Sequence, residues 1–220
     1  MRNGRVVVLD GPAGAGKSTV AREVARRLGL AFLDTGAIYR AITWAMRSDA
    51  IPPEDSPRLR EKLSAFDVSF HGGRVFACGQ DVTEAIRTPE IDGAVSAYSA
   101  LPVVRESLLG IQRAQASDGL VAEGRDMGTV VFPDADVKIF LTASSAARAR
   151  RRYDERVARG EAADYDEILA AVARRDELDS TRAVAPLRPA EDAIVLDTTD
   201  LALDEVVEAV LRCAAEVAAR

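Results

Sequence analysis

The sequence is poor in the residues that build metal and disulfide sites. Its 220 residues include only two cysteines, Cys78 and Cys213, and one histidine, His71. The two cysteines have no paired spacing that would make a disulfide framework or a metal site, and we expect both to be buried or incidental thiols. His71 lies in a predicted turn, where a surface residue is the usual outcome. A mechanism built on a catalytic histidine is therefore not expected.

Long apolar runs and an excess of positive charge are also missing. No apolar span reaches the 18 residues of a transmembrane helix, and the apolar stretch after the first residues is too short for a signal peptide. The net charge is −6, whereas general nucleic-acid binders attract the phosphate backbone through a basic surface. We therefore expect a cytoplasmic protein that has neither nucleic acid nor a membrane as partner.

Lysine is scarce as well, which leaves arginine as the main cation. Only Lys17, Lys62 and Lys138 are lysines among the 29 basic residues. The planar guanidinium of arginine suits bidentate contacts with phosphate. The hydrophobic fraction of 48% and the charged fraction of 29% are ordinary for a globular protein. The length allows one sizeable core with insertions.

Residues 11–18 read GPAGAGKS, which is the complete G-x-x-x-x-G-K-[ST] phosphate-binding pattern. An apolar run precedes them and a helical pattern follows, in the order that the motif requires. The glycines let backbone N–H groups face a polyphosphate, and the helix directs its positive end at the same charge. Lys17 should neutralise the outer phosphates, and Ser18 should hold Mg²⁺. The expected ATP-binding loop comprises Gly11, Pro12, Ala13, Gly14, Ala15, Gly16, Lys17, Ser18 and Thr19.

The order of the apolar patterns predicts an α/β fold. Strands are expected near 5–10, 31–33, 119–123, 137–141 and 193–196, and helices near 17–29, 37–47, 102–117, 144–160, 164–179 and 203–219. Alternation of strands and helices predicts a doubly wound, five-stranded parallel sheet with helices on both faces. Residues 66–82 alternate apolar and polar side chains around His71-Gly72-Gly73, which indicates a small antiparallel hairpin outside the main sheet.

Absent motifs narrow the possible functions of the phosphate loop. Such loops occur in GTPases, motor-type ATPases and small-molecule kinases. The single asparagine, Asn3, excludes the Asn-Lys-x-Asp guanine-reading motif. No run of four apolar residues ends in an Asp-Glu or Asp-Asp pair, which weakens an ATPase reading. A small-molecule kinase remains, and it needs dispersed arginines to align two polyanions.

Five stretches, of which the first contains the phosphate loop, carry a resemblance to a known family. They are DGPAGAGKST (10–19), DTGAIYRA (34–41), EAIRTPEI (84–91), EGRDMGTVVFPDADVKIFL (123–141) and TRAVAPL (181–187). Together they closely resemble the bacterial cytidylate kinases, the long form of the nucleoside monophosphate kinase family. The resemblance implies a single P-loop domain over 1–220. Its core covers about 1–35, 106–149 and 163–220, with an acceptor-binding insertion at about 36–105 and a short lid at about 150–162.

The resemblance also implies the activity and the site. ATP should phosphorylate CMP and dCMP with Mg²⁺ as cofactor, and the protein should be a monomer. Lys17, Arg125 and Arg182 should be catalytic. The residues implied for CMP form three groups: Thr35, Tyr39, Arg40, Arg125 and Arg182 for the phosphate, Ser96, Arg105 and Asp126 for the cytosine edge, and Arg175 and Asp179 for the ribose.

Two positions depart from the family pattern without losing a functional group. Thr35 stands where many relatives have serine, and it keeps the hydroxyl while adding a methyl group. Glu123 stands where aspartate is common, and it leaves open whether this carboxylate orients a metal-bound water. Asp10, just before the loop, either fixes the loop or assists the metal site from outside its ligand shell.

Several alternatives stay open at this stage. Arg148, Arg152 and Arg156 recur every four residues and share one helix face. They either fold over ATP, where we favour Arg148 and Arg152, or form a solvated face paired with nearby acids such as Glu161. The chain as a whole could be a kinase for another small acceptor, or a nucleotide-sensing module that has lost catalysis.

Overall fold

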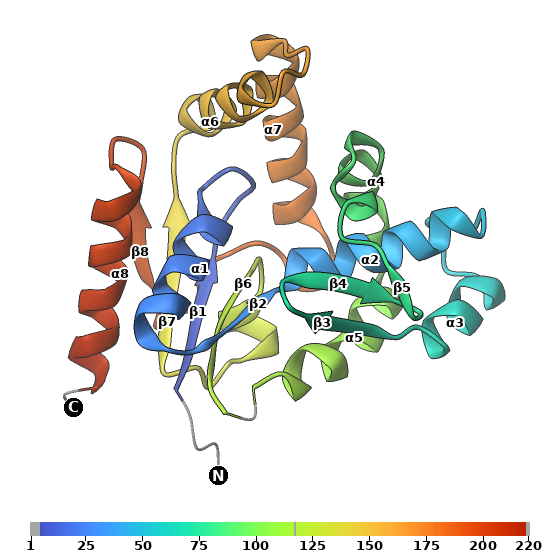
Figure 1. Ribbon diagram of the computed structural model, residues 1–220, viewed down its shortest axis with the longest axis horizontal. Helices are drawn as coiled ribbons and strands as arrows, with labels where there is room; N and C mark the ends of the chain where they lie inside the picture. Colours follow the sequence, from blue (N-terminus) through green and yellow to red (C-terminus); the bar gives the residue numbers. More distant parts are fainter. Residues whose placement is uncertain (1–4, 117, 219–220) are drawn as a thin grey trace. The chain divides into compact units, whose positions relative to one another are not determined.

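A five-stranded sheet forms the centre of the larger of two compact units in this computed structural model, which describes residues 5–116 and 118–218 (Figure 1). The strand order is β2-β6-β1-β7-β8. β1 pairs in parallel with β6 and β7, and β7 pairs in parallel with β8, which confirms the expected parallel sheet. The strands are β1 (Val6–Asp10), β2 (Ala31–Asp34), β6 (Leu120–Gly124), β7 (Val137–Thr142) and β8 (Ile194–Asp197).

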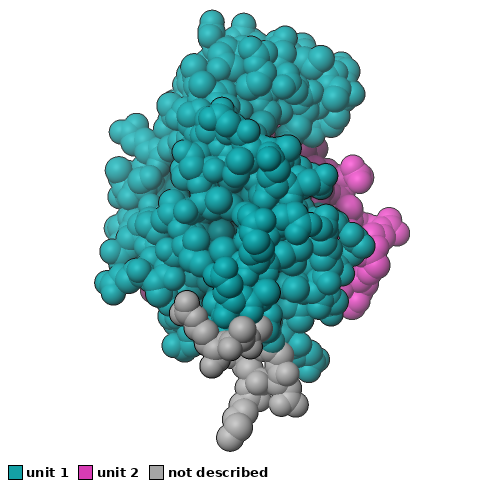
Figure 2. Space-filling view, turned by 90° about the vertical axis from the view of Figure 1, so that its left-hand side faces the viewer, with its two compact units in different colours: residues 1–33, 115–220 teal, residues 34–114 magenta. Residues whose placement is uncertain are grey.

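The two units are Met1–Leu33 with Gln115–Arg220, and Asp34–Ala114 (Figure 2). The helices of the first unit are α1 (Lys17–Leu28), α6 (Ser145–Ala158), α7 (Tyr165–Thr181) and α8 (Leu203–Ala218). A π-helical turn, η2 (Met127–Val131), follows β6. Within the described ranges, no helix is long and apolar enough to span a membrane.

Strand alternation decides what each face of the sheet touches. Val7 and Leu9 of β1 join Val121 and Ile139 in one apolar cluster with α1 and α8. Val8 points to the opposite face, where its side chain lies beside Gly128 of η2. Asp10 lies two positions after Val8 on β1 and therefore faces η2. Glu123 lies two positions after Val121 on β6 and therefore faces α1. This alternation places the site residues.

The second unit contains a three-stranded antiparallel sheet and several helices. The order β3-β4-β5 is built on a hairpin whose turn residues Gly72 and Gly73 both have positive φ, at 58° and 78°. The predicted hairpin is confirmed, and a third strand extends it. The elements are α2 (Thr35–Ser48), α3 (Pro57–Ser64), β3 (Val68–His71), β4 (Arg74–Ala77), β5 (Gln80–Asp81), η1 (Ala85–Arg87), α4 (Pro89–Ser99) and α5 (Pro102–Ala114).

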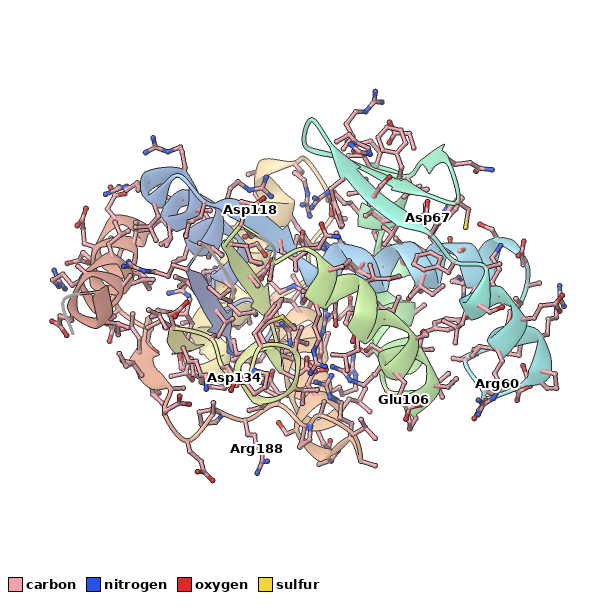
Figure 3. All side chains as sticks on the ribbon, turned by 90° about the horizontal axis from the view of Figure 1, so that it is seen from below. Arg60, Asp67, Glu106, Asp118, Asp134 and Arg188 are labelled. Carbon is pink, nitrogen blue, oxygen red and sulfur yellow. The ribbon has the colours of Figure 1, made fainter. Side chains whose placement is uncertain are left out.

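Helix starts in this unit differ from the expectation because of capping. α2 begins at Thr35, not near 37, since the Asp34 carboxylate accepts the Ala37 N–H at 2.8 Å. α3 and α4, which begin at Pro57 and Pro89, were not separately predicted. Each proline occupies the first turn behind a Ser or Thr cap. Arg60 of α3 (Figure 3) pairs at the surface with Asp55. The predicted helix ends at Ser117 and Ala219 lie outside the described residues.

Candidate active site

The phosphate loop joins β1 to α1 and needs its glycines for two different reasons. A Cβ atom on Gly11 would lie 2.0 Å from the Leu141 carbonyl oxygen, so the backbone of β7 leaves no room for a side chain. Gly14 and Gly16 adopt positive φ angles of 78° and 86°, which L side chains rarely adopt. The strand, loop and helix therefore follow in the order that the motif predicted.

Lys17 is the first residue of α1, and its side chain is buried. The residue is 5% exposed, and Nζ donates to the Pro12 carbonyl oxygen at 2.8 Å. Burial and the nearby Arg125 lower the Lys17 pKa to about 7, while Glu123 opposes this shift. An anionic ligand beside the ammonium would offset both causes. The loop thus holds a cation that is costly to keep charged in the absence of such a ligand.

Ser18 and Glu123 form the second polar contact of the loop. Glu123 lies two residues beyond Val121 on β6, so it faces α1, whose second residue is Ser18. The Ser18 hydroxyl donates to the Glu123 carboxylate. A hydroxyl and a carboxylate are oxygen ligands of the kind that Mg²⁺ prefers. Glutamate in place of the commoner aspartate therefore still reaches the hydroxyl.

Asp10 fixes the chain after β6. Its two carboxylate oxygens accept the N–H groups of Met127 at 2.9 Å and Gly128 at 2.8 Å. Burial raises the Asp10 pKa to about 6, although these two hydrogen bonds favour the charged form. The π-helical turn that it caps has its own i→i+5 bond, from Phe132 N to Met127 O at 2.7 Å. Asp10 thereby ties the end of β1 to the turn that follows Asp126.

Arg125, Asp126, Asp179 and Arg182, which the resemblance implied for ligand binding, lie close to one another. Arg125 Nε donates to Asp179 Oδ2 at 2.8 Å. Arg182 lies 3.8 Å from Asp126 and 3.9 Å from Asp179, with its side chain only 5% exposed. Burial would raise the Asp179 pKa, but Arg125 and the other nearby cations lower it overall. Arg175 on α7 also acts on the Lys17 charge. The end of β6 and the C-terminal half of α7 thus supply one arginine-rich group.

The predicted residues of the second unit form two further contacts. Arg40 lies 3.4 Å from Asp34, and its Nε is buried with no hydrogen-bond acceptor among the described residues. The Arg105 guanidinium lies 5.1 Å from the centre of the Tyr39 ring and donates to the Ser99 carbonyl at 3.0 Å. These contacts fix the side chains of Arg40 and Arg105, two arginines that the resemblance implied for CMP. Thr35 is buried at the start of α2, and Ser96 is half-buried on α4.

The arginines of α6 fall into different environments. Arg148 is buried at 4% exposure and bonded to protein acceptors, whereas Arg152 is half-buried. Arg156 and Arg159 pair with Glu161, as the surface alternative predicted. Sequence reasoning missed one partner, Asp176 of α7, which bonds Arg148. No local motif marks Asp176, because its partner lies on another helix.

Comparisons with known proteins identify the family of the chain. The profile of the family described as "Cytidylate kinase" matches residues 7–216. A cytidylate kinase of Mycobacterium leprae (strain Br4923) is 52% identical over 204 residues, 92% of each chain. A cytidylate kinase of Exiguobacterium sp. (strain ATCC BAA-1283 / AT1b) is 46% identical over 224 residues, which cover all of both chains.

A solved structure supports the fold alone. The crystal structure of an uncharacterized protein from Eubacterium ventriosum ATCC 27560 matches with a TM-score of 0.52 at 10% identity, covering 98% of this chain and 99% of that one. The family profile, in contrast, covers nearly the whole sequence, including the phosphate loop and the arginines after β6 and on α7. The chain therefore belongs to the cytidylate kinase family.

Proposed function

We propose that the protein transfers the outer phosphoryl group of ATP to CMP or dCMP and releases ADP with CDP or dCDP. The family match supports this acceptor and donor. Transfer is direct and in line, with no covalent intermediate on the enzyme. An acceptor phosphate oxygen is already a competent nucleophile, so the protein has to align and neutralise the reactants and supplies no general base.

The observation that carries this proposal is the concentration of positive charge around Lys17. Arg125 and Arg175 are close enough to lower its pKa, and Arg182 joins Arg125 through Asp179. Glu123 lies beside Lys17 and Asp179 lies between Arg125 and Arg182, so carboxylates offset part of this charge in the absence of a ligand. Two phosphorylated ligands held in line would bind such a set of cations, whereas attack by water on a single nucleotide would need fewer cations.

On the donor side, Lys17 and the loop amides would hold the polyphosphate, together with Thr19 and Arg152. Ser18 would hold Mg²⁺, with Glu123 as its neighbour. When bound, the ion would neutralise charge on the outer phosphates. Lys17 would exchange its bond to the Pro12 carbonyl for a phosphate oxygen, and its pKa would rise accordingly.

The residues proposed for the acceptor come from two parts of the sequence. In the second unit, Arg40 would bind the acceptor phosphate through its Nε, with Thr35 and Tyr39 beside it, and Ser96 and Arg105 would address cytosine. In the first unit, Arg125 and Arg182 would bind phosphate, Asp126 would accept from cytosine N4, and Arg175 and Asp179 would bind ribose. Uracil presents a carbonyl oxygen in place of that amino donor, so the Asp126 carboxylate would face another acceptor and uracil should be disfavoured.

The remaining sequence-based expectations belong to the same proposal. The acceptor-binding insertion, the lid over about 150–162, a monomeric state, the absence of nucleic-acid and membrane partners, and a cytoplasmic location stay predictions. Closure of the lid over bound nucleotides would keep water from the transferring phosphoryl group.

A kinase assay with CMP, dCMP, UMP, AMP and GMP tests the proposal. ADP production with ATP should be fastest with CMP or dCMP, and UMP or AMP as best acceptor would refute the specificity. Lys17→Ala should abolish turnover, since it removes the cation of the donor site. Arg182→Ala should mainly raise the KM for CMP. Near-normal kinetics in either variant would contradict the assigned roles.

A further inference from the structure

The Arg148 guanidinium is completely occupied by protein acceptors. Nε donates to the Ala143 carbonyl at 2.9 Å. Nη1 donates to the Ala13 carbonyl at 3.1 Å and to Asp176 Oδ1 at 2.9 Å. Nη2 donates to Ser145 Oγ at 3.0 Å and to Asp176 Oδ2 at 2.6 Å. An arginine has five N–H groups, and all five are used here. None is left to donate to a nucleotide phosphate.

One of those acceptors belongs to the phosphate loop itself. The Ala13 carbonyl and the Gly14 N–H lie in one rigid, trans peptide plane and point in opposite directions. Because Arg148 holds the carbonyl on its own side, the Gly14 N–H has to face away from it. The same helix also limits the loop sterically, since a Cβ on Gly14 would lie 3.1 Å from Arg148 Cβ. The position of Arg148 therefore sets the orientation of a loop amide.

Asp176 sets the position of Arg148. The carboxylate meets the guanidinium with two parallel hydrogen bonds, the geometry that restricts orientation most. The Arg148 side chain is 4% exposed and that of Asp176 25%, so solvent competes little for the guanidinium. Asp176 also lies one helical turn before Asp179, which bonds Arg125. α6 and α7 contact each other and cross near the top of Figure 1, and this contact brings the two residues together.

We propose that Asp176, acting through Arg148, is a positioning residue for the donor loop. It holds Arg148 where that side chain orients the Ala13–Gly14 peptide, so that the Gly14 N–H faces the polyphosphate. The inference rests on the proposed nucleotide-binding role of the loop. It assigns Arg148 to the loop backbone and leaves phosphate contacts from α6 to Arg152.

Binding of ADP, measured by calorimetry without any acceptor, tests the proposal. Asp176→Asn keeps the size of the side chain but replaces one accepting oxygen with an amide donor. ADP affinity should fall about tenfold or more, because the Gly14 N–H would lose a hydrogen bond to a charged phosphate, and such a bond contributes about that much to affinity. The KM for ATP should rise in parallel, while the KM for CMP changes less than twofold. Glu177→Gln, an exposed neighbour on α7, is the matched control and should behave as wild type.

A double-mutant cycle with Arg148→Lys completes the test. Lysine cannot form the bidentate contact with Asp176, so the ADP affinity of the double variant should be no lower than that of either single variant. If Asp176→Asn leaves ADP affinity unchanged or tighter while Arg148→Lys weakens it, Arg148 is a direct ligand and the proposal is wrong. Reduced thermal stability with unchanged ADP affinity would also overturn it.

A second variant guards against misfolding, and the readout is independent of the acceptor. Asp176→Glu keeps the charge and moves the carboxylate by one methylene, so ADP affinity should fall by less than in Asp176→Asn; an undiminished affinity would count against the proposal. ADP binding does not involve CMP. A failure of CMP as acceptor would therefore refute the proposed function and leave this result standing.

Discussion

Removing the buried ammonium should make the protein less active but more stable. Lys17→Met deletes a cation whose pKa is lowered to about 7 by burial and by Arg125. A lysine with a depressed folded-state pKa contributes full stability only above its unfolded pKa, near 10.4, and that stability is lost as the pH falls toward 7. Between these values the unfolded chain binds one more proton. The free energy of unfolding of the wild type should therefore rise with pH, relative to the variant, by about 1 kcal/mol per pH unit.

Urea unfolding followed by circular dichroism at several pH values from 7.5 to 9 measures this difference. The wild type should gain about 2 kcal/mol relative to Lys17→Met across that range. Asp10, with a pKa of about 6, titrates below it and does not interfere. Ser18→Ala is the control, since it damages the same loop but keeps Lys17, so it should follow the wild-type slope. Turnover of Lys17→Met should fall by at least about 10². Parallel slopes for wild type and Lys17→Met would show that the ammonium is not destabilised by burial.

Three further variants probe the loop, the π-helical turn and the acceptor side. Gly11→Ala should lower stability by about 3 kcal/mol or more, because its Cβ would overlap the Leu141 backbone carbonyl; a melting temperature near that of the wild type would contradict this. Gly128→Ala should cost only about 1 kcal/mol, since its Cβ would meet the movable Lys138 stem at 3.2 Å, and an equal loss in both glycine variants would count against the distinction. Arg40→Met should raise the KM for CMP more than tenfold and leave ADP affinity unchanged; an unaltered KM for CMP would remove Arg40 from the acceptor side.

The sequence was sufficient to predict the sheet because its signals are local. Each parallel strand is a short apolar run, and GPAGAGKS occupies the only strand-to-helix turn with the full motif. The two glycines of the hairpin likewise carry their turn geometry in their own conformational freedom. Predictions of this kind need only a few neighbouring residues.

What the sequence could not supply depends on partners far along the chain. The role of Asp10 depends on two backbone amides more than 100 residues later in the chain. No sequence pattern near either position predicts the π-helical turn. Arg148 has the spacing of a surface helix face, yet Asp176 and the Ala13 carbonyl bury it. Tertiary contacts override such periodicity. The helices that begin at Pro57 and Pro89 have short, weakly periodic sequences, and each starts with a proline behind a Ser or Thr cap.

The position of β1 in the middle of the sheet has a consequence for how the chain folds. β1 carries the phosphate loop, but both of its neighbours, β6 and β7, come more than 100 residues later in the chain. Loop-closure entropy opposes such pairings until much else is formed, and topologies of this kind fold slowly. Gly11 also rests against Leu141, at the end of β7. During synthesis the nucleotide loop therefore cannot take its final shape until about two thirds of the chain has been made.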